Sequence, residues 1–172
     1  GDDLVAGSCE GSYVVQHLYA ATDDCGNMVE RILTVTFIDT IAPTITLAAQ
    51  NMNVECDADI QAELDTWLAN QGGATSTDIC SDVTWSYLPV DPILSDSCGK
   101  SGDVTVTFTA IDDCGNSIET VATFTVLKDT TAPVLIGAPL DITVECNAIP
   151  DTASVTATDN CSSVTVTSSV DL

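Results

Sequence analysis

A repeat with a period of about 90 residues constrains this chain more than any other feature of its sequence. The motif DDCGN begins at Asp23 and again 89 residues later at Asp112, and D-T-x-A-P begins at Asp39 and 90 residues later at Asp129. The tripeptide VEC recurs with the same 90-residue offset. A fixed period of this size indicates an array of small domains rather than one large fold.

The phase of the repeat divides the chain into one complete unit and two halves. Residues 39–128 form the complete unit, 1–38 carry the motifs of its C-terminal half, and 129–172 carry those of its N-terminal half. Joined tail to head, the two halves contain the motifs of the complete unit in the same order. We therefore expect residues 129–172 to be completed by residues 1–38 of the next copy.

Short segments in which apolar residues alternate with threonine predict half-buried antiparallel strands. Residues 104–110 and 118–126 flank a DDCGN turn and predict a hairpin, which residues 13–37 repeat. The other strand candidates are residues 44–47, 53–56, 74–78, 83–88 and 164–168. This pattern predicts an all-β fold of tandem immunoglobulin-like β-sandwich repeats of about 80–90 residues.

One segment of the complete unit has a helical rather than a strand-like pattern. Ile60, Leu64, Trp67 and Leu68 have the spacing of one helix face, and the pair Gly72-Gly73 follows them. The half units lack this stretch, because Cys56 and Cys80 are 24 positions apart whereas Cys146 and Cys161 are 15 apart. We therefore expect a short helical insertion in the complete unit.

Charge and cysteine content limit the partners and the compartment. With 26 acidic residues against 3 basic ones, the net charge of −23 disfavours nucleic acid and anionic membrane surfaces. The chain has no stretch of 18 apolar residues and no signal peptide, so we expect no membrane insertion and, if it is exported, a mature segment. Eight cysteines at repeat positions indicate disulfides and an extracellular or cell-surface location. The alternative is a set of buried free thiols in a cytosolic protein.

Three motifs together resemble a known group of repeats. D-T-x-A-P at the start of a unit, VEC after an early strand and A-[IT]-D-D-C-G-N before the last strand are similar to the hyalin-repeat (HYR-like) and related bacterial immunoglobulin-like modules. The cysteine-rich form resembles tandem repeats in large secreted surface adhesins and filaments of Bacteroidota. The resemblance covers the whole chain and implies a stalk, spacer or adhesive array.

Two disulfide arrangements respect the repeat in the complete unit. Either Cys56 bonds with Cys80 and Cys98 with Cys114, or the pairs cross, with Cys56 bonded to Cys98 and Cys80 to Cys114. The predicted strand over residues 104–111 separates Cys98 from Cys114 by roughly 26 Å, whereas bonded Cα atoms lie within about 7 Å. This separation favours the crossed arrangement, unless the residues after Cys98 fold back.

The same crossed rule makes a prediction for the joined unit. Cys146 would bond with Cys9, and Cys161 with Cys25. If the two halves come from successive subunits, these bonds are intermolecular.

Acidic residues converge at one end of each unit and predict a calcium site, because Ca²⁺ takes six to eight oxygen ligands in flexible geometry. The candidate ligands are Asp39, Asp78, Asp82, Asp112, Asp113 and Asn116 in the complete unit, and Asp23, Asp24, Asn27, Asp129, Asp159 and Asn160 in the joined unit. The alternatives are that hairpin turns favour Asp and Asn for their own sake, or that the acids keep a long extracellular chain in solution.

Three Asp-Thr-x tripeptides resemble the D-[ST]-x signal for O-glycosylation in Bacteroidota, with acceptors Thr40, Thr130 and Thr152. Asp-Thr is also ordinary loop chemistry. Asn160-Cys161-Ser162 matches the N-glycosylation pattern formally.

The sequence gives little support for catalysis. His17 is the single histidine and falls at a strand position that corresponds to inward Val106, so we expect it to be packed. The chain lacks a second histidine and a Gly-rich phosphate loop, and the pair Asp23-Asp24 belongs to a turn. We therefore expect no enzymatic activity.

The leading interpretation is a structural repeat of an extracellular filament or cell-surface adhesin, whose partners are copies of itself in a head-to-tail array. The repeat belongs either to one very long chain or to separate subunits that complete one another. The first alternative is a Ca²⁺-dependent module that binds surface glycans or host surfaces through Trp67 and Trp85, although we expect both tryptophans in the core. The second is an arbitrary fragment that holds one complete domain.

Overall fold

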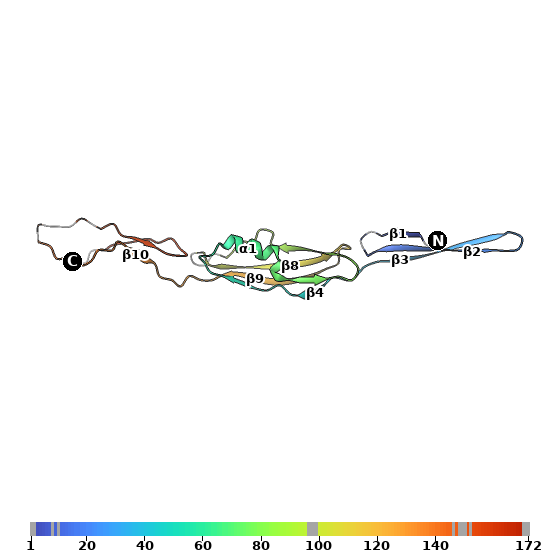
Figure 1. The fold of residues 1–172 in the computed structure, drawn as a ribbon, viewed down its shortest axis with the longest axis horizontal. Coiled ribbons are helices and arrows are strands. Elements are labelled where there is room, and N and C mark those ends of the chain that lie inside the picture. Colours follow the sequence, from blue (N-terminus) through green and yellow to red (C-terminus); the bar gives the residue numbers. More distant parts are fainter. Residues whose placement is uncertain are drawn as a thin grey trace.

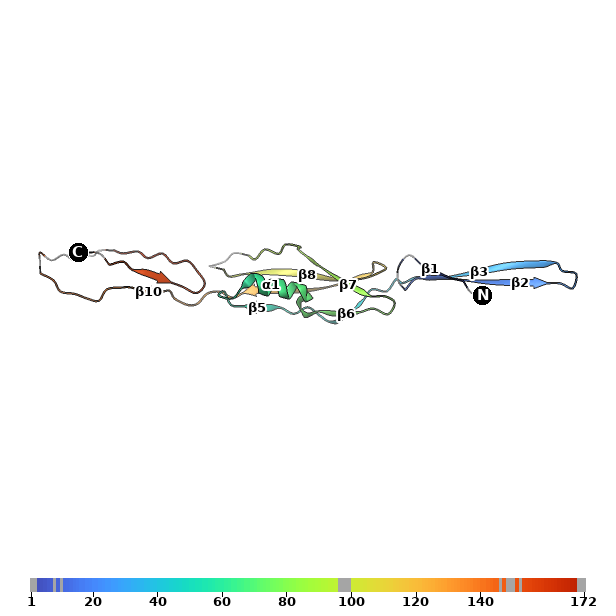
Figure 2. The same ribbon diagram turned by 45° about the horizontal axis from the view of Figure 1, so that its top comes forward.

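The computed structural model describes residues 3–7, 9, 11–95, 100–145, 147, 151 and 153–169. The chain forms three parts in a row along one axis (Figure 1). We call residues 3–38 the N-terminal part, 39–128 the central part and 129–169 the C-terminal part. The N-terminal and C-terminal parts lie at opposite ends of this row, with the central part between them (Figures 1 and 2).

The described residues of the central part form one α-helix and two sheets. Its elements are β4 (Thr44–Leu47), β5 (Met52–Val54), α1 (Ile60–Ala69), the 3-10 turn η1 (Gln71–Gly73), β6 (Thr75–Thr77), β7 (Val83–Leu88), β8 (Gly102–Asp112) and β9 (Ser117–Val126). One sheet has the order β5-β9-β8-β7, and β4 pairs with β6 in the other. All of these pairs are antiparallel except β5 with β9, which is parallel. The prediction of a strand-rich fold with one helical segment is confirmed.

The core lies between the four-stranded sheet and the helix. Alternate residues of β8 and β9 point inward, so that Val106, Phe108 and Phe124 are fully buried. Helix α1 buries Leu64, Trp67 and Leu68 against this face, and the Asp59 side chain caps its first turn by accepting the amide N–H of Ala62. The inward residues of the strands, which alternate along the sequence, and the buried face of the helix, which recurs every three to four residues, therefore pack into one core.

The N-terminal part repeats the central hairpin. Strands β2 (Tyr13–Thr22) and β3 (Met28–Phe37) pair as β8 and β9 do, and β1 (Asp3–Ala6) pairs with the first residues of β2. Each DDCGN turn places its glycine in the left-handed region, with φ of 86° at Gly26 and 88° at Gly115, where glycine is the favoured residue. Both turns are closed by the same hydrogen bonds, from Asp23 N to Asn27 O (2.9 Å) and from Asp112 N to Asn116 O (3.0 Å).

The C-terminal part has little regular structure. Strand β10 (Val134–Ile136) pairs with β11 (Thr156–Thr158), whereas residues 164–168, predicted as a strand, form none. That prediction is wrong for the isolated chain, because a segment becomes a strand through pairing and none of the described strands pairs with this one. The predicted strands at 53–56 and 74–78 exist in shorter form, as β5 and β6.

Candidate functional site

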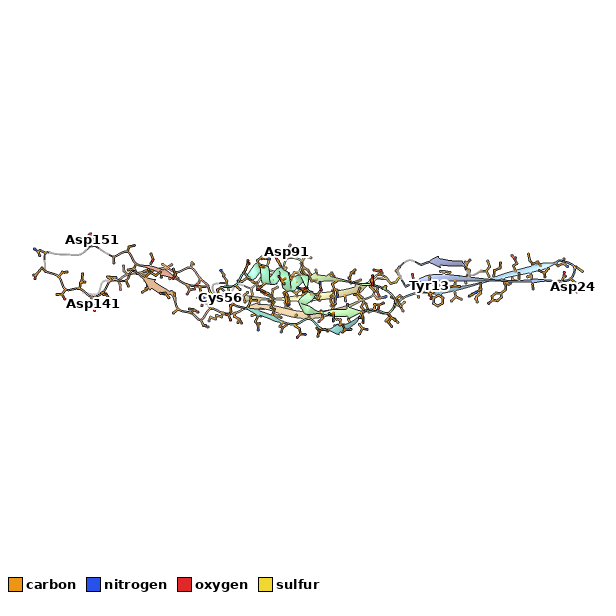
Figure 3. The ribbon with its side chains drawn as sticks, viewed as in Figure 1. Tyr13, Asp24, Cys56, Asp91, Asp141 and Asp151 are labelled. Atoms are coloured by element: carbon orange, nitrogen blue, oxygen red, sulfur yellow. A yellow bond between two sulfur atoms is a disulfide. The ribbon has the colours of Figure 1, made fainter. Side chains whose placement is uncertain are left out.

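Among the described residues, two disulfides join the three parts of the molecule. Cys9 of the N-terminal part bonds with Cys114 at the tip of the β8–β9 hairpin, and the two Cα atoms are 5.1 Å apart. Cys56 after β5 bonds with Cys161 of the C-terminal part, with a Cα separation of 5.4 Å. Figure 3 shows Cys56 at the junction between the central and C-terminal parts. Both bonds join residues 105 positions apart, so each crosses from one repeat into the next.

The crossed pairings predicted from the sequence are therefore wrong. They assigned Cys56 to Cys98, Cys80 to Cys114, Cys146 to Cys9 and Cys161 to Cys25, and each of these pairs contains a cysteine that is bonded elsewhere. Cys98 and Cys146 themselves lie outside the described residues.

The error has a physical reason. The loop that carries Cys80 does lie beside the hairpin tip, as expected, because Asp113 N donates to Ser81 Oγ at 3.3 Å. The prediction assumed, however, that each bond stays within one unit. At the junction the N-terminal part brings Cys9 to Cys114, which leaves Cys80 unbonded.

Cys25 and Cys80 are free and exposed. Cys80 lies next to Gly11, at the contact between the N-terminal and central parts. We call this contact the first junction. A Cβ atom at Gly11 would lie 2.6 Å from the carbonyl oxygen of Cys80, and the φ of Gly11 is 79°, so glycine is required there for two reasons. The junction is thus closely packed around the backbone that carries this thiol.

Several predicted calcium ligands hold the turns in place. Asp112 Oδ1 accepts the amides of Cys114 (2.9 Å) and Asn116 (2.8 Å), and Asp112 Oδ2 accepts the Asn116 side-chain amide (2.8 Å). Asp23 makes the same contacts with Cys25 and Asn27. These bonds account for much of the Asp and Asn content of the hairpin tips.

The hydrogen bonds of the turns also lower the pKa values of Asp23 and Asp112. Burial raises the pKa of Asp112, but the hydrogen bonds from Asn116, Cys114 and Gly115 outweigh this effect, so the pKa lies below 3.8. The side-chain amide of Asn27 is the largest cause that lowers the pKa of Asp23.

Asp159 has a lowered pKa for the same kind of reason. The backbone amides of Cys161 and Ser162 donate to its Oδ1 at 2.9 Å each, and they lower the pKa below 3.8.

An acidic cluster remains at the first junction. Single ligand atoms of Asp39, Asp78 and Cys80 all lie within 4.8 Å of one another. Asp39 is buried, and its Oδ2 has no hydrogen-bond partner among the described residues. Desolvation, followed by the charges of Asp39, Asp78 and Asp112, raises the pKa of the Cys80 thiol.

At the contact between the central and C-terminal parts, which we call the second junction, the ligand atoms of Cys56, Asp129 and Cys161 lie within 4.8 Å of one another. Its two sulfur atoms are joined in a disulfide, so they cannot act as thiolate ligands. Asp159 Oδ2 is buried and also lacks a hydrogen-bond partner among the described residues.

The remaining predicted ligands lie elsewhere. Asp82 and Asp113 are exposed and belong to neither junction cluster. Figure 3 places Asp24 at the outer tip of the N-terminal hairpin, whereas Asp129 and Asp159 belong to the part at the other end of the molecule. Asn27 and the exposed Asn160 are separated in the same way. A single chain therefore does not assemble the ligand set predicted for the joined unit.

Trp67 belongs to the core, and the half-buried Trp85 packs against it. Trp67 is 6% exposed and donates its indole N–H to Gln50 O at 3.0 Å, while Trp85 packs against the core cluster. Trp67 therefore offers no exposed face to a sugar ring. His17 is partly buried in β2, where it stands opposite Leu33 of β3.

The predicted glycosylation sites are accessible where the structure describes them. Thr40 and Thr130 are exposed, and Thr152 lies outside the described residues. Asp39 Oδ1 accepts the amide of Ile41 (3.0 Å) and Asp129 Oδ1 that of Thr131 (2.8 Å), so both tripeptides also form ordinary Asp turns.

Exposed apolar surface at the two ends of the molecule is a feature that composition did not predict. The N-terminal hairpin exposes Leu18, Tyr19, Met28, Val29, Ile32, Leu33 and Phe37, and the C-terminal part exposes Val134, Leu135, Ile136, Leu140, Ile142, Val144 and Val166. Large exposed apolar patches on soluble proteins mark interaction sites. The repeat was the signal that pointed to part of this surface, because Tyr19, Leu33 and Phe37 correspond to Phe108, Ala122 and Val126, which are buried in the complete unit.

Comparison with known proteins does not assign the chain to a family. No protein-family model matches the chain, and no curated protein matches its sequence. Within the described part of the chain, no helix has the length and apolar character needed to cross a membrane.

Proposed function

We propose that this chain is a structural repeat unit of an extracellular filament or cell-surface adhesin, and that its copies assemble head to tail. The observation that carries the proposal is one pair of equivalent positions. Phe108 in β8 is fully buried, whereas Tyr19, which stands 89 residues earlier at the same place in β2, is 60% exposed. The same hairpin is therefore covered in one repeat and bare in the other.

Strand β3 supports the same conclusion. Leu33 and Phe37 are 48% and 43% exposed, while their equivalents Ala122 and Val126 are each 2% exposed. Exposed apolar area of this kind costs roughly 25 cal/mol per Å² relative to burial. A second copy supplies the flanking strands, because its C-terminal part carries the sequence counterparts of β5 and β7, whereas α1, which packs on Phe108, has no counterpart there.

The C-terminal part has the complementary deficiency. It exposes Ile142, Val144 and Val166, which correspond to Met52, Val54 and Trp85. In the central part these three equivalents belong to the core or pack against it. Each end of the chain thus lacks what the other end carries, and such a heterologous contact generates an open filament rather than a closed ring.

An extracellular location accords with the two disulfides, which persist in oxidising compartments. The immunoglobulin-like sandwich and the tandem array remain part of this proposal, supported by the paired sheets of the central part and by the repeated hairpin. We assign the chain a mechanical role and no catalysis.

Calcium reinforcement at the first junction is a further part of the proposal. The buried Asp39 Oδ2 lies next to Asp78 and has no hydrogen-bond partner in the part of the chain that the structure describes, and a divalent cation satisfies this kind of oxygen. The net charge of −23 also favours cation binding.

Electron microscopy of the purified protein tests the assembly. We expect unbranched filaments whose subunits lie end to end along the long axis of the molecule. Dispersed single molecules at concentrations up to the solubility limit, in oxidising buffer with Ca²⁺, would contradict the proposed function.

A further inference from the structure

We propose that the β2–β3 hairpin of one copy inserts between two segments of the preceding copy, residues 142–144 and 164–169, and forms with them a four-stranded sheet of defined register. This inference rests on the proposed head-to-tail assembly and specifies its interface. The partner is a second copy of this chain.

The central sheet provides the template. Its order is β5-β9-β8-β7, so the hairpin supplies the two middle strands, and the strands on either side come from residues 52–54 and 83–88. The C-terminal part has the sequence equivalents of both outer strands, at residues 142–144 and 164–169. It lacks the hairpin, which stands at the other end of the molecule (Figure 1).

The N-terminal hairpin has the matching free edges. Strand β2 pairs with β1 over residues 13–16, whereas over residues 18–22 it pairs with β3 alone among the described strands. The equivalent stretch of β8, residues 107–112, pairs with β7. The outer edge of β3 at residues 35–37 corresponds to the edge of β9 that binds β5. Unpaired strand edges of this kind are templates for strand addition.

The register follows from the observed pairs. β7 pairs with β8 from Val83 opposite Asp112 to Leu88 opposite Thr107, so residues 164–169 would run antiparallel to β2 from Val164 opposite Asp23 to Ser169 opposite Leu18. By the same transfer, residues 142–144 would run parallel to β3. In that arrangement the pairs are Ile142 with Val35, Thr143 with Thr36 and Val144 with Phe37.

The side chains fit this register. Transfer of the Tyr87–Phe108 pair places Tyr19 opposite Ser168, beside a hollow of about 400 Å³ in the C-terminal part. The hollow is lined by Leu135, Ala138, Ala153, Val155, Val166, Thr167 and Ser168. An aromatic ring therefore meets a recess lined by apolar side chains together with Thr167 and Ser168, as Phe108 meets the core in the central part.

Photo-crosslinking tests the register in assembled material. Tyr19 is replaced by benzoylphenylalanine, filaments are grown from a mixture of ¹⁴N-labelled and ¹⁵N-labelled protein, and crosslinked peptides are identified by mass spectrometry. We expect mixed-isotope crosslinks from position 19 to residues 135 or 164–169. Benzoylphenylalanine at Ala20, which points to the opposite face of β2, serves as the matched control and should not give crosslinks to residue 135.

The possible failures are distinguishable. Filaments whose crosslinks from position 19 map to other segments, or join peptides of one copy, would overturn the register and leave the proposed function standing. Protein that forms no filaments would overturn both.

We infer a second feature from the cysteines, independently of the strands: Cys25 and Cys80 form disulfides with the preceding copy. The two observed bonds define a rule, since Cys9 is the repeat equivalent of Cys98, and Cys161 that of Cys80. Each bond joins a cysteine of one unit to a cysteine of the following unit. Applied to a second copy, the rule pairs Cys25 with Cys98, and Cys80 with Cys146, of the preceding copy.

The free thiols stand where this rule requires them. Cys80 is exposed at the first junction, against Gly11, and Cys25 is exposed at the tip of the N-terminal hairpin that would enter the preceding copy. Formation of each bond removes two protons and two electrons from two thiols. An external disulfide oxidant takes the electrons by thiol–disulfide exchange and becomes a dithiol.

Peptide mapping tests these bonds. Trypsin is unsuitable, because Arg31, Lys100 and Lys128 are its only cleavage positions and Cys56, Cys80 and Cys98 would remain on one fragment. Pepsin at low pH separates the cysteines and suppresses exchange. From mixed-isotope filaments we expect peptides of Cys25 linked to Cys98, and of Cys80 linked to Cys146, with one label on each side.

Electrophoresis without reductant provides the second readout. The wild-type protein should give a ladder, and Cys25→Ser/Cys80→Ser should run as a monomer while it keeps the bonds of Cys9 and Cys56. Each single variant keeps one bond per interface and should still give a ladder. A ladder from the double variant, or wild-type peptides that link Cys25 or Cys80 to other partners, would overturn the disulfide rule, and filaments in the same sample would preserve the proposed function.

Discussion

Trp67 of α1 meets Phe108 of β8 edge to face, with ring centroids 5.2 Å apart and an interplanar angle of 75°. This contact joins the helical insertion to the centre of the sheet. Aromatic pairs in this geometry contribute about 0.5–1.5 kcal/mol beyond the area that they bury.

Phe108→Ala should therefore destabilise the central part strongly. Loss of a fully buried phenylalanine leaves a cavity, and the expected decrease in the free energy of unfolding is about 3–5 kcal/mol. Tyr19→Ala, at the equivalent position of the bare hairpin, should change stability by no more than about 0.5 kcal/mol in dilute, unassembled protein. Urea unfolding followed by far-UV circular dichroism, to which the strands of both parts contribute, measures both, and equal losses would contradict the difference in burial.

Assembly should depend on one face of residues 164–169. Val166→Glu would place a charge at the position of Trp85, which packs on the core, and we expect it to raise the critical concentration for filament formation at least tenfold. Thr165→Glu adds the same charge one residue earlier, on the opposite face of the expected strand, and should have less than a threefold effect. Sedimentation of filaments at a series of protein concentrations gives both values, and equal effects would count against an inward Val166.

The free energy of unfolding should decrease in acid, because the aspartates of the turns become protonated there. The pKa values of Asp23, Asp112 and Asp159 are lowered from 3.8 in the folded protein, so the folded state binds fewer protons than the unfolded chain near this pH. Their contribution to stability is therefore complete above pH 3.8 and is lost as the pH falls through the lower folded values.

Urea midpoints measured between pH 2 and pH 7 check this expectation. Asp112→Asn should lower the midpoint at pH 7 and show a smaller further decrease on acidification than the wild type, because one titrating group is absent. Parallel pH profiles for the two proteins would mean that Asp112 does not titrate as its hydrogen bonds indicate.

Calcium should stabilise the protein through Asp39. At a free Ca²⁺ concentration of about 100 times the Kd, binding to the folded state would add about 2.7 kcal/mol and raise the Tm. Asp39→Asn should remove most of this increase, whereas Asp113→Asn, at an exposed position outside the cluster, should keep it. Calorimetry in Ca²⁺ and in chelator makes the comparison, and an unchanged Tm for the wild type would exclude a structural ion at this junction.

The local structure could be predicted where residue pattern and turn chemistry agree. The alternation of apolar residues and threonine predicted β8 and β9, the spacing of Ile60, Leu64 and Trp67 predicted α1, and Asp and Gly predicted the hairpin turns. In each case the determinant is local, since the period of the side chains decides which face is buried.

The disulfides could not be predicted in the same way. Loop lengths and strand lengths placed Cys80 near Cys114, and this proximity is present in the structure, yet Cys114 bonds with Cys9. A sequence limits how far apart two cysteines can be. It does not determine which of several cysteines from other parts of the chain lies within bonding distance in the folded protein.

The sequence by itself determined the period of the repeat, its phase and the strand pattern of each unit, because these depend on the order of residues along the chain. The tertiary structure decided which cysteines meet, that residues 164–169 form no strand in a single copy, and that Tyr19 is bare where Phe108 is buried. These outcomes depend on which segments lie beside one another in space. Side-chain period specifies a face for burial, and only the neighbouring segment determines whether that face is covered.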